Sequence, residues 1–151
     1  MTTDPAAPLQ HPRGSWRDGW YVAPHHVVFR DLDAFGHVNN AVFFSYFEWA
    51  RALYWFELFG WRGAGGIDFI VARAECDFRR QLALEPIELA VRVGEMRSSS
   101  FTFHQEIRTA GGEVAASGKV IVVLYDWARQ SKVPIPDDLR RKIAECSPDV
   151  F

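Results

Sequence analysis

FRDLDAFGHVNNAVFFSYFEWARALYWFELFG, residues 29–60, is the stretch that decides the fold. A short polar loop opens it, and the second part, residues 42–59, has apolar side chains on nearly all sides of a helix. They are interrupted only by a narrow polar line, formed by Ser45, Glu48 and Arg51, and by Glu57 near the end. A helix of this kind either spans a membrane or is buried in protein, and its charges argue against a span, which needs about 20 apolar residues. We therefore expect the rest of the chain to wrap around it.

The sequence marks both ends of this helix. Asn39 or Asn40 is expected to cap its start, because a short side-chain oxygen accepts from the free N–H groups of the first turn. Gly60 is expected to end it. The glycine-rich stretch 61–66 that follows, WRGAGG, lacks the GK[ST] ending of a phosphate-binding loop and is interpreted as a connector.

Elsewhere the apolar residues recur with a period of two, which is typical of strands. The predicted strands span residues 25–30, 68–80, 87–97, 100–109 and 113–126. Residues 110–112, Ala-Gly-Gly, form a hairpin turn between the last two. A short helix is expected to begin at Asp137 or Asp138 and to run through Ala144. The simplest arrangement is an α+β fold in which five antiparallel strands curl around the long helix.

Composition restricts the function classes. The chain has 151 residues, 48% hydrophobic and 24% charged, and a net charge of -2, so neither nucleic acid nor a membrane surface is an expected partner. Residues 1–24 are expected to be a flexible arm without the apolar core of a secretory signal, and residues 25–151 to form a single domain. The two cysteines, Cys76 and Cys146, are far apart in the sequence and favour a reducing cytoplasm.

The polar loop concentrates chemical groups just before a helix start. The free N–H groups there can hold a developing oxyanion, and a loop carboxylate can activate water or attack directly. Asp31 and Asp33 could equally cap turns, and the residues alone leave both interpretations open. Asp31, Asp33 and His37 also suggest a metal site, but no second cluster of ligands accompanies them, so neither a metal nor a cofactor is expected.

The loop carries a recognisable motif, D-x-D-x-x-G-H-V-x-N. It is formed by Asp31, Asp33, Gly36, His37, Val38 and Asn40, with Phe43 or Phe44 for a following aromatic residue and Glu48 and Arg51 on the helix. This pattern resembles the signature of the hotdog-fold acyl-CoA thioesterases of the 4-hydroxybenzoyl-CoA thioesterase type. The likeness covers roughly residues 25–140, although Gln81 stands where the family commonly has proline.

The resemblance implies a five-stranded hotdog sheet around one long helix and hydrolysis of an acyl-CoA to free acid and coenzyme A. It also implies homodimers or homotetramers with active sites at the subunit interface. The aromatic helix suits an aryl or medium-chain acyl group, but core packing explains the same residues. A non-catalytic acyl-CoA-binding hotdog module and a thioesterase acting on acyl carrier protein are the alternatives. An aspartate-nucleophile phosphatase would need repeated strand–helix units, which this sequence lacks.

By position in the motif, the resemblance implies a role for each loop residue. Asp33 matches the catalytic carboxylate, as general base or nucleophile, and the backbone N–H of Asn40 matches the group that polarises the thioester carbonyl. His37 orients Asp33 or a water, or braces the loop. Gly36 and Val38 pass close to the substrate. Glu48 is expected to be a buried partner of Arg51 or of the loop.

Residues outside the loop are implied to bind coenzyme A. Arg97, Ser99 and Ser100 match the strand junction that contacts the coenzyme, and Lys132 is a weaker candidate for its phosphates. Arg79 and Arg80 are interpreted as exposed strand charges.

Overall fold

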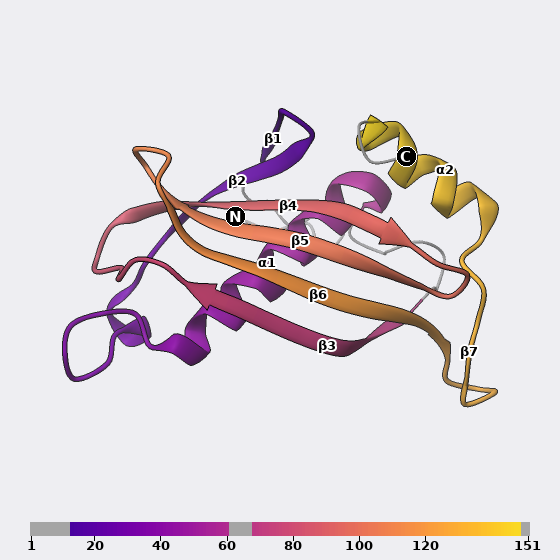
Figure 1. Ribbon diagram of the computed structural model, residues 1–151, viewed down its shortest axis with the longest axis horizontal. Coiled ribbons are helices and arrows are strands. Elements are labelled where there is room, and N and C mark those ends of the chain that lie inside the picture. The colour runs from indigo at the N-terminus through magenta and orange to yellow at the C-terminus, as the bar shows by residue number, and fades with distance from the viewer. Residues whose placement is uncertain (1–12, 61–67, 149–151) are drawn as a thin grey trace, which may run out of the picture.

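A long helix, α1 (Asn40–Phe59), lies against one face of an antiparallel sheet (Figure 1). The computed structural model describes residues 13–60 and 68–148. Its strands are β1 (Ser15–Arg17), β2 (Trp20–His26), β3 (Asp68–Phe78), β4 (Pro86–Met96), β5 (Ser100–Thr109), β6 (Val114–Asp126) and β7 (Ser131–Lys132). A 3-10 turn, η1 (Phe29–Asp31), precedes α1, and α2 (Asp137–Cys146) follows the sheet. The predicted α+β class, with one long helix and a short C-terminal helix, is confirmed.

The strand order explains the apolar run of β6 and leaves an edge at β3. The sheet runs β1-β2-β4-β5-β6-β3, and the short strand β7 pairs with the last residues of β6. β6 is paired on both sides, as its continuous apolar run predicts. β3 is paired only with β6 in the described part of the chain, so its other edge is open. The glycine-rich stretch 61–66 lies outside the described residues.

The first long strand begins earlier than predicted. β2 pairs with β4 from Tyr21 to His26, whereas the predicted strand at residues 25–30 enters η1 and the loop. The apolar run that suggested it is misleading, because Phe29 is 82% exposed. Tyr21 is fully buried instead, and its ring packs edge-on against Tyr54 of α1. The last part of the predicted arm therefore belongs to the sheet, while the division into arm and domain stays a prediction.

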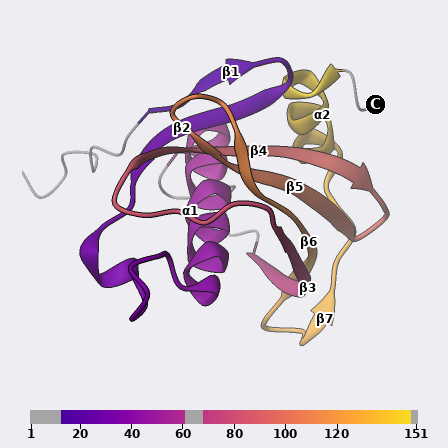
Figure 2. The ribbon, with the colours of Figure 1, turned by 60° about the vertical axis from the view of Figure 1, so that its left-hand side comes forward.

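Figure 2 shows α1 lying along one face of the sheet, and aromatic side chains form much of the core between them. Tyr54 packs edge-on against Phe103 of β5, and Trp55 packs against Phe69 of β3. Such ring pairs contribute about 0.5–1.5 kcal/mol beyond the area they bury. The predicted alternation of β5 is confirmed, since every second residue from Phe101 to Ile107 is buried.

One buried polar residue, Gln105, joins β5 to α1. Its Nε2 donates to the backbone oxygen of Phe47 at 2.7 Å, and its Oε1 accepts from Nη1 of Arg51 at 3.0 Å. Burial lowers the pKa of Arg51, and the charge of Glu48 opposes that shift. The side chain of Glu48 is exposed and forms no hydrogen bond with any described residue. The prediction that Glu48 is a buried partner is therefore wrong, because Gln105 takes that place.

The helix is not covered on every side. Phe44, Ser45 and Glu48 remain exposed on the face that points away from the sheet. In the described ranges, no helix combines the length and hydropathy needed to cross a membrane.

We expect Gly118→Ala to destabilise the protein. An added Cβ at this position of β6 would overlap the buried ring of Phe47 and would lie 2.9 Å from the backbone oxygen of Glu75. Overpacking of this kind costs about 1–3 kcal/mol. Gly111→Ala is the control, because its nearest neighbour would be Thr109 Oγ1 at 3.8 Å. Urea denaturation measures both variants, and equal stability would contradict the packing described here.

Candidate active site

The loop before α1 contains a tight turn centred on Asp33. The backbone N–H of Asp33 donates to the oxygen of His37 at 2.8 Å, and that of Gly36 donates to the oxygen of Asp33 at 3.1 Å. Gly36 has a φ of 78°, a conformation that glycine adopts without steric cost. Asp33 Oδ1 accepts from the N–H groups of Phe35 (2.9 Å) and His37 (3.3 Å). Within the described residues Oδ2 has no hydrogen-bond partner, so one oxygen holds the turn and the other is available.

The start of α1 leaves one amide available beside this turn. Asn39 caps the helix, because its Oδ1 accepts from the N–H of Ala41 at 2.9 Å. The N–H of Asn39 donates to Asp31 and that of Val42 donates to Asn39. The N–H of Asn40 has no partner in the described part of the chain. It therefore combines an unpaired donor with the partial positive charge of a helix N-terminus.

A pocket of about 440 Å³ brings these groups together. It is lined by Asp33, Phe35, His37, Val38, Asn40, Phe43, Phe78, Arg79, Arg80 and Gln81. Asp33, His37, Val38 and Asn40, which the motif singled out, thus share one cavity. Gly36 shapes the turn without lining it. The backbone of His37 holds the turn, and no hydrogen bond joins its ring to another described residue.

Sequence reasoning missed one wall of this pocket, residues 79–81. The N–H groups of Arg79 and Arg80 both donate to the backbone oxygen of Ala115, so the regular strand pairing stops before them. β3 therefore ends at Phe78, two residues earlier than predicted. Arg80 pairs with Glu85 and Glu113, whereas Arg79 donates from Nε to Ser117. They are exposed, as predicted, but the Val38–Leu82 backbone bond brings this segment beside the loop. No local sequence pattern predicts a contact between Val38 and Leu82, which are far apart in the sequence.

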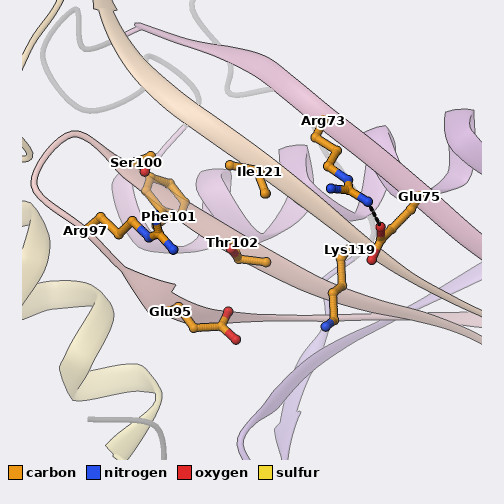
Figure 3. Close-up of a pocket in the computed structure, with 9 residues that line it drawn as sticks. All are labelled: Arg73, Glu75, Glu95, Arg97, Ser100, Phe101, Thr102, Lys119 and Ile121. Atoms are coloured by element: carbon orange, nitrogen blue, oxygen red, sulfur yellow. Dashed lines mark hydrogen bonds and ion pairs between the residues drawn. The ribbon is translucent and has the colours of Figure 1, made fainter.

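A second hollow, of about 380 Å³, lies on the sheet face turned away from α1 (Figure 3). It is lined by Arg73, Glu75, Glu95, Arg97, Ser100, Phe101, Thr102, Lys119 and Ile121. Arg97 and Ser100, predicted to bind coenzyme A, meet here. Ser99 and Lys132 do not line it, and Lys132 lies on β7.

The charges of this hollow leave a small excess of cations, because three cationic and two acidic side chains line it. Arg73 is paired with Glu75 at 2.9 Å, and Glu95 is hydrogen-bonded to His104 at 3.1 Å. Neither Arg97 nor Lys119 forms an ion pair with any described residue. The turn that carries Arg97 and the loop that carries Asp33 lie at opposite ends of the molecule (Figures 1 and 2). The two candidate subsites are therefore separate within one chain.

No metal site accompanies either hollow. Throughout residues 13–60 and 68–148, no group of three or more His, Cys, Asp and Glu side chains is placed to hold a metal ion.

Comparison with known proteins identifies the family. The model of the thioesterase-like superfamily matches residues 27–143. The chain belongs to the thioesterase-like superfamily. Its membership confirms the predicted resemblance to hotdog thioesterases and the predicted enzyme class, a thioesterase.

Similar proteins occur in several bacteria. YsmA of Bacillus subtilis strain 168, an uncharacterized protein, is 34% identical over 98 residues, which are 64% of this chain and 67% of that protein. The long-chain acyl-CoA thioesterase FadM of Escherichia coli K12 is 27% identical over 118 residues, covering 76% of this chain and 89% of FadM. A thioesterase of Thermus thermophilus, solved with coenzyme A and zinc, is 35% identical with a TM-score of 0.74 and covers 84% of this chain and 94% of that one.

Proposed function

We propose that this thioesterase hydrolyses an acyl-CoA to free acid and coenzyme A in the pocket at the start of α1. One observation carries the proposal: Asp33 and Asn40 line the same cavity, and Oδ2 of Asp33 and the N–H of Asn40 have no hydrogen-bond partner among the described residues. The acyl-CoA substrate of FadM and the coenzyme A bound to the Thermus protein support this substrate class.

The chemistry needs a carboxylate and an oxyanion donor. Acting as a base, Asp33 takes a proton from a water that attacks the thioester carbon. Acting as a nucleophile, it forms an anhydride with the acyl group, which water then opens. In both routes the N–H of Asn40 stabilises the oxyanion, and the C–S bond breaks as the departing sulfur gains a proton. The ring of His37 holds the water or orients Asp33.

The pocket wall suits an apolar acyl group. Phe35, Phe43 and Phe78 line the pocket, and the rings of Phe43 and Phe78 meet edge-on at 5.2 Å. Val38 lines the pocket beside them. We infer that the acyl group is aryl or medium-chain. The name of FadM implies a longer acyl chain. The rates of hydrolysis of benzoyl-, octanoyl- and palmitoyl-CoA distinguish the two.

We propose that the protein acts in the cytoplasm. Cys76 and Cys146 are free, and burial raises the pKa of Cys76 to about 11, so this side chain stays an unreactive thiol at neutral pH. Free, unpaired cysteines are typical of a reducing compartment.

The open edge of β3 supports a homodimer, or a tetramer built from two dimers. This strand is 11 residues long, and an exposed edge of that length is a site for pairing with another chain. Val71 and Phe78 on β3 are half exposed, and Phe44 of α1 adds a further exposed ring. Because the pocket and the turn that carries Arg97 lie at opposite ends of the molecule, a site shared between subunits would bring them together.

We expect light scattering at micromolar concentration to find at least a dimer. Val71→Lys should shift the protein toward monomer, because it places a charge on the edge strand. Val28→Lys is the matched control, since Val28 has a similar exposure but lies off β3. A monomeric wild-type protein would overturn the assembly proposed here.

Asp33→Asn should fold normally and lose most turnover. The Asn oxygen can still accept from Phe35 and His37, so the turn is kept, but the amide can neither take a proton nor attack. General-base assistance is worth about 10²–10⁴-fold in rate, and kcat on any accepted acyl-CoA measures the loss. Asp138→Asn, an exposed carboxylate of α2 at the other end of the molecule, is the control. Near wild-type turnover in Asp33→Asn would remove Asp33 from the mechanism.

Arg97, Ser99, Ser100 and Lys132 are proposed to bind the coenzyme. Arg97→Ala should raise KM for acyl-CoA by about tenfold, the worth of one charged hydrogen bond, with little change in kcat, because the phosphates bind alike in ground and transition states. An N-acetylcysteamine thioester lacks the nucleotide and should show no such change. Arg129→Ala, which removes a highly exposed arginine, is the control. Equal losses on both substrates would show that Arg97 acts on the fold.

A further inference from the structure

We propose that Asp31 and Tyr46 are a positioning pair, which holds the Asp33 turn against the start of α1 without touching the substrate. The inference rests on the function proposed above for Asp33 and Asn40, and it concerns residues whose role that function leaves open.

Asp31 forms hydrogen bonds with residues before the loop, at the helix cap and within the helix. The residue is 9% exposed, and its Oδ2 accepts from the Tyr46 hydroxyl at 2.7 Å and from the N–H of Val28 at 3.0 Å. Its backbone N–H donates to Val28, and its backbone oxygen accepts from the N–H of Asn39, the helix cap. One residue thus ties together the exit of β2, the cap of α1 and the body of the helix.

The donors to this carboxylate are neutral. Asp31 forms no ion pair with any described residue, and a buried carboxylate is costly unless hydrogen bonds replace its water. At 2.7 Å the bond from Tyr46 has the usual length of an O–H···O hydrogen bond. Burial, and next the bond to Asp31, raise the pKa of Tyr46 above its ordinary value, so the hydroxyl stays a donor throughout the neutral range.

This bond closes the loop onto the helix that supplies the oxyanion donor. Tyr46 lies six residues after Asn40, roughly 9 Å along the helix axis at about 1.5 Å per residue. The loop leaves Asp31, forms the Asp33 turn and returns to Asn39, which is bonded to Asp31 again. The separation of Asp33 and Asn40 is therefore held by Asp31, and the orientation of Asp31 is held by Tyr46.

The pair does not face the proposed substrate pocket. Asp31 and Tyr46 line a different cavity, of about 550 Å³, together with His25, whose ring packs edge-on against Tyr46. Neither lines the pocket of Asp33 and Asn40. Their effect on the reaction must therefore pass through the loop.

Tyr46→Phe tests the pair, because it removes the hydroxyl and keeps the ring. We expect kcat to fall about tenfold or more, since small misplacements of reacting groups are expensive, while KM changes less than twofold. Asp31→Asn should lower kcat similarly, and the double variant should lose little more than either single variant. Tyr54→Phe is the matched control: Tyr54 is a fully buried tyrosine of the same helix whose ring packs against β5, and the loss of its hydroxyl should leave kcat unchanged.

The background of Asp33→Asn separates this inference from the proposed function. If the pair acts through Asp33, Tyr46→Phe should cost little of the residual turnover of Asp33→Asn. Equal losses in both backgrounds, an unchanged kcat in Tyr46→Phe, or a loss that vanishes at a lower assay temperature would each overturn the positioning role. If Asp33→Asn keeps full turnover, the proposed function itself fails, whatever Tyr46→Phe does.

Discussion

The structure depends on the burial of α1 against the inner face of the sheet. Because apolar residues surround most of this helix, hydrophobic burial alone would tolerate several rotations about its axis. Gln105 removes that freedom, since its amide reaches both the backbone of Phe47 and the guanidinium of Arg51 inside the core. A buried amide with its bonds made is stable in one rotation of the helix and costly in others. The direction of the helix start, and hence of Asn40, follows from this bond.

The candidate site joins a rigid element to a short loop. The sheet orients the helix, and the helix presents an unpaired amide at its first turn. Two backbone hydrogen bonds hold the Asp33 turn, together with two that the Asp33 carboxylate accepts. The carboxylate proposed to act in the reaction is therefore oriented by the turn that it helps to hold. The outer hollow is of a different kind, because its cations extend from β3, from β6 and from the turn that carries Arg97, and such a surface is suited to binding rather than to bond breaking.

Much of the fold is readable from local patterns, and the exceptions have physical causes. The period-two strands, the Asn39 cap and the Gly60 stop are local signals, and the structure has them. The start of β2 has no local signal, because Tyr21 is buried against Tyr54, which belongs to a helix later in the chain. For the site, motif spacing places Asp33, His37, Val38 and Asn40 in one pocket. The wall formed by residues 79–81 depends on a tertiary backbone contact, which no window of sequence contains.

The turn between β4 and β5 is held by the C-terminal part of the chain. Arg140 donates to the backbone oxygen of Arg97, and the N–H of Ile135 donates to the oxygen of Ser98. These partners are synthesised about 40 residues after the turn, a delay of roughly 2–8 s at translation rates of about 5–20 residues per second. During synthesis the loop of Asp33 is followed at once by its helix, whereas the turn of Arg97 lacks these two hydrogen bonds until the C-terminal part is made. The partners of the end proposed for bond breaking are thus synthesised before those of the end proposed for the coenzyme.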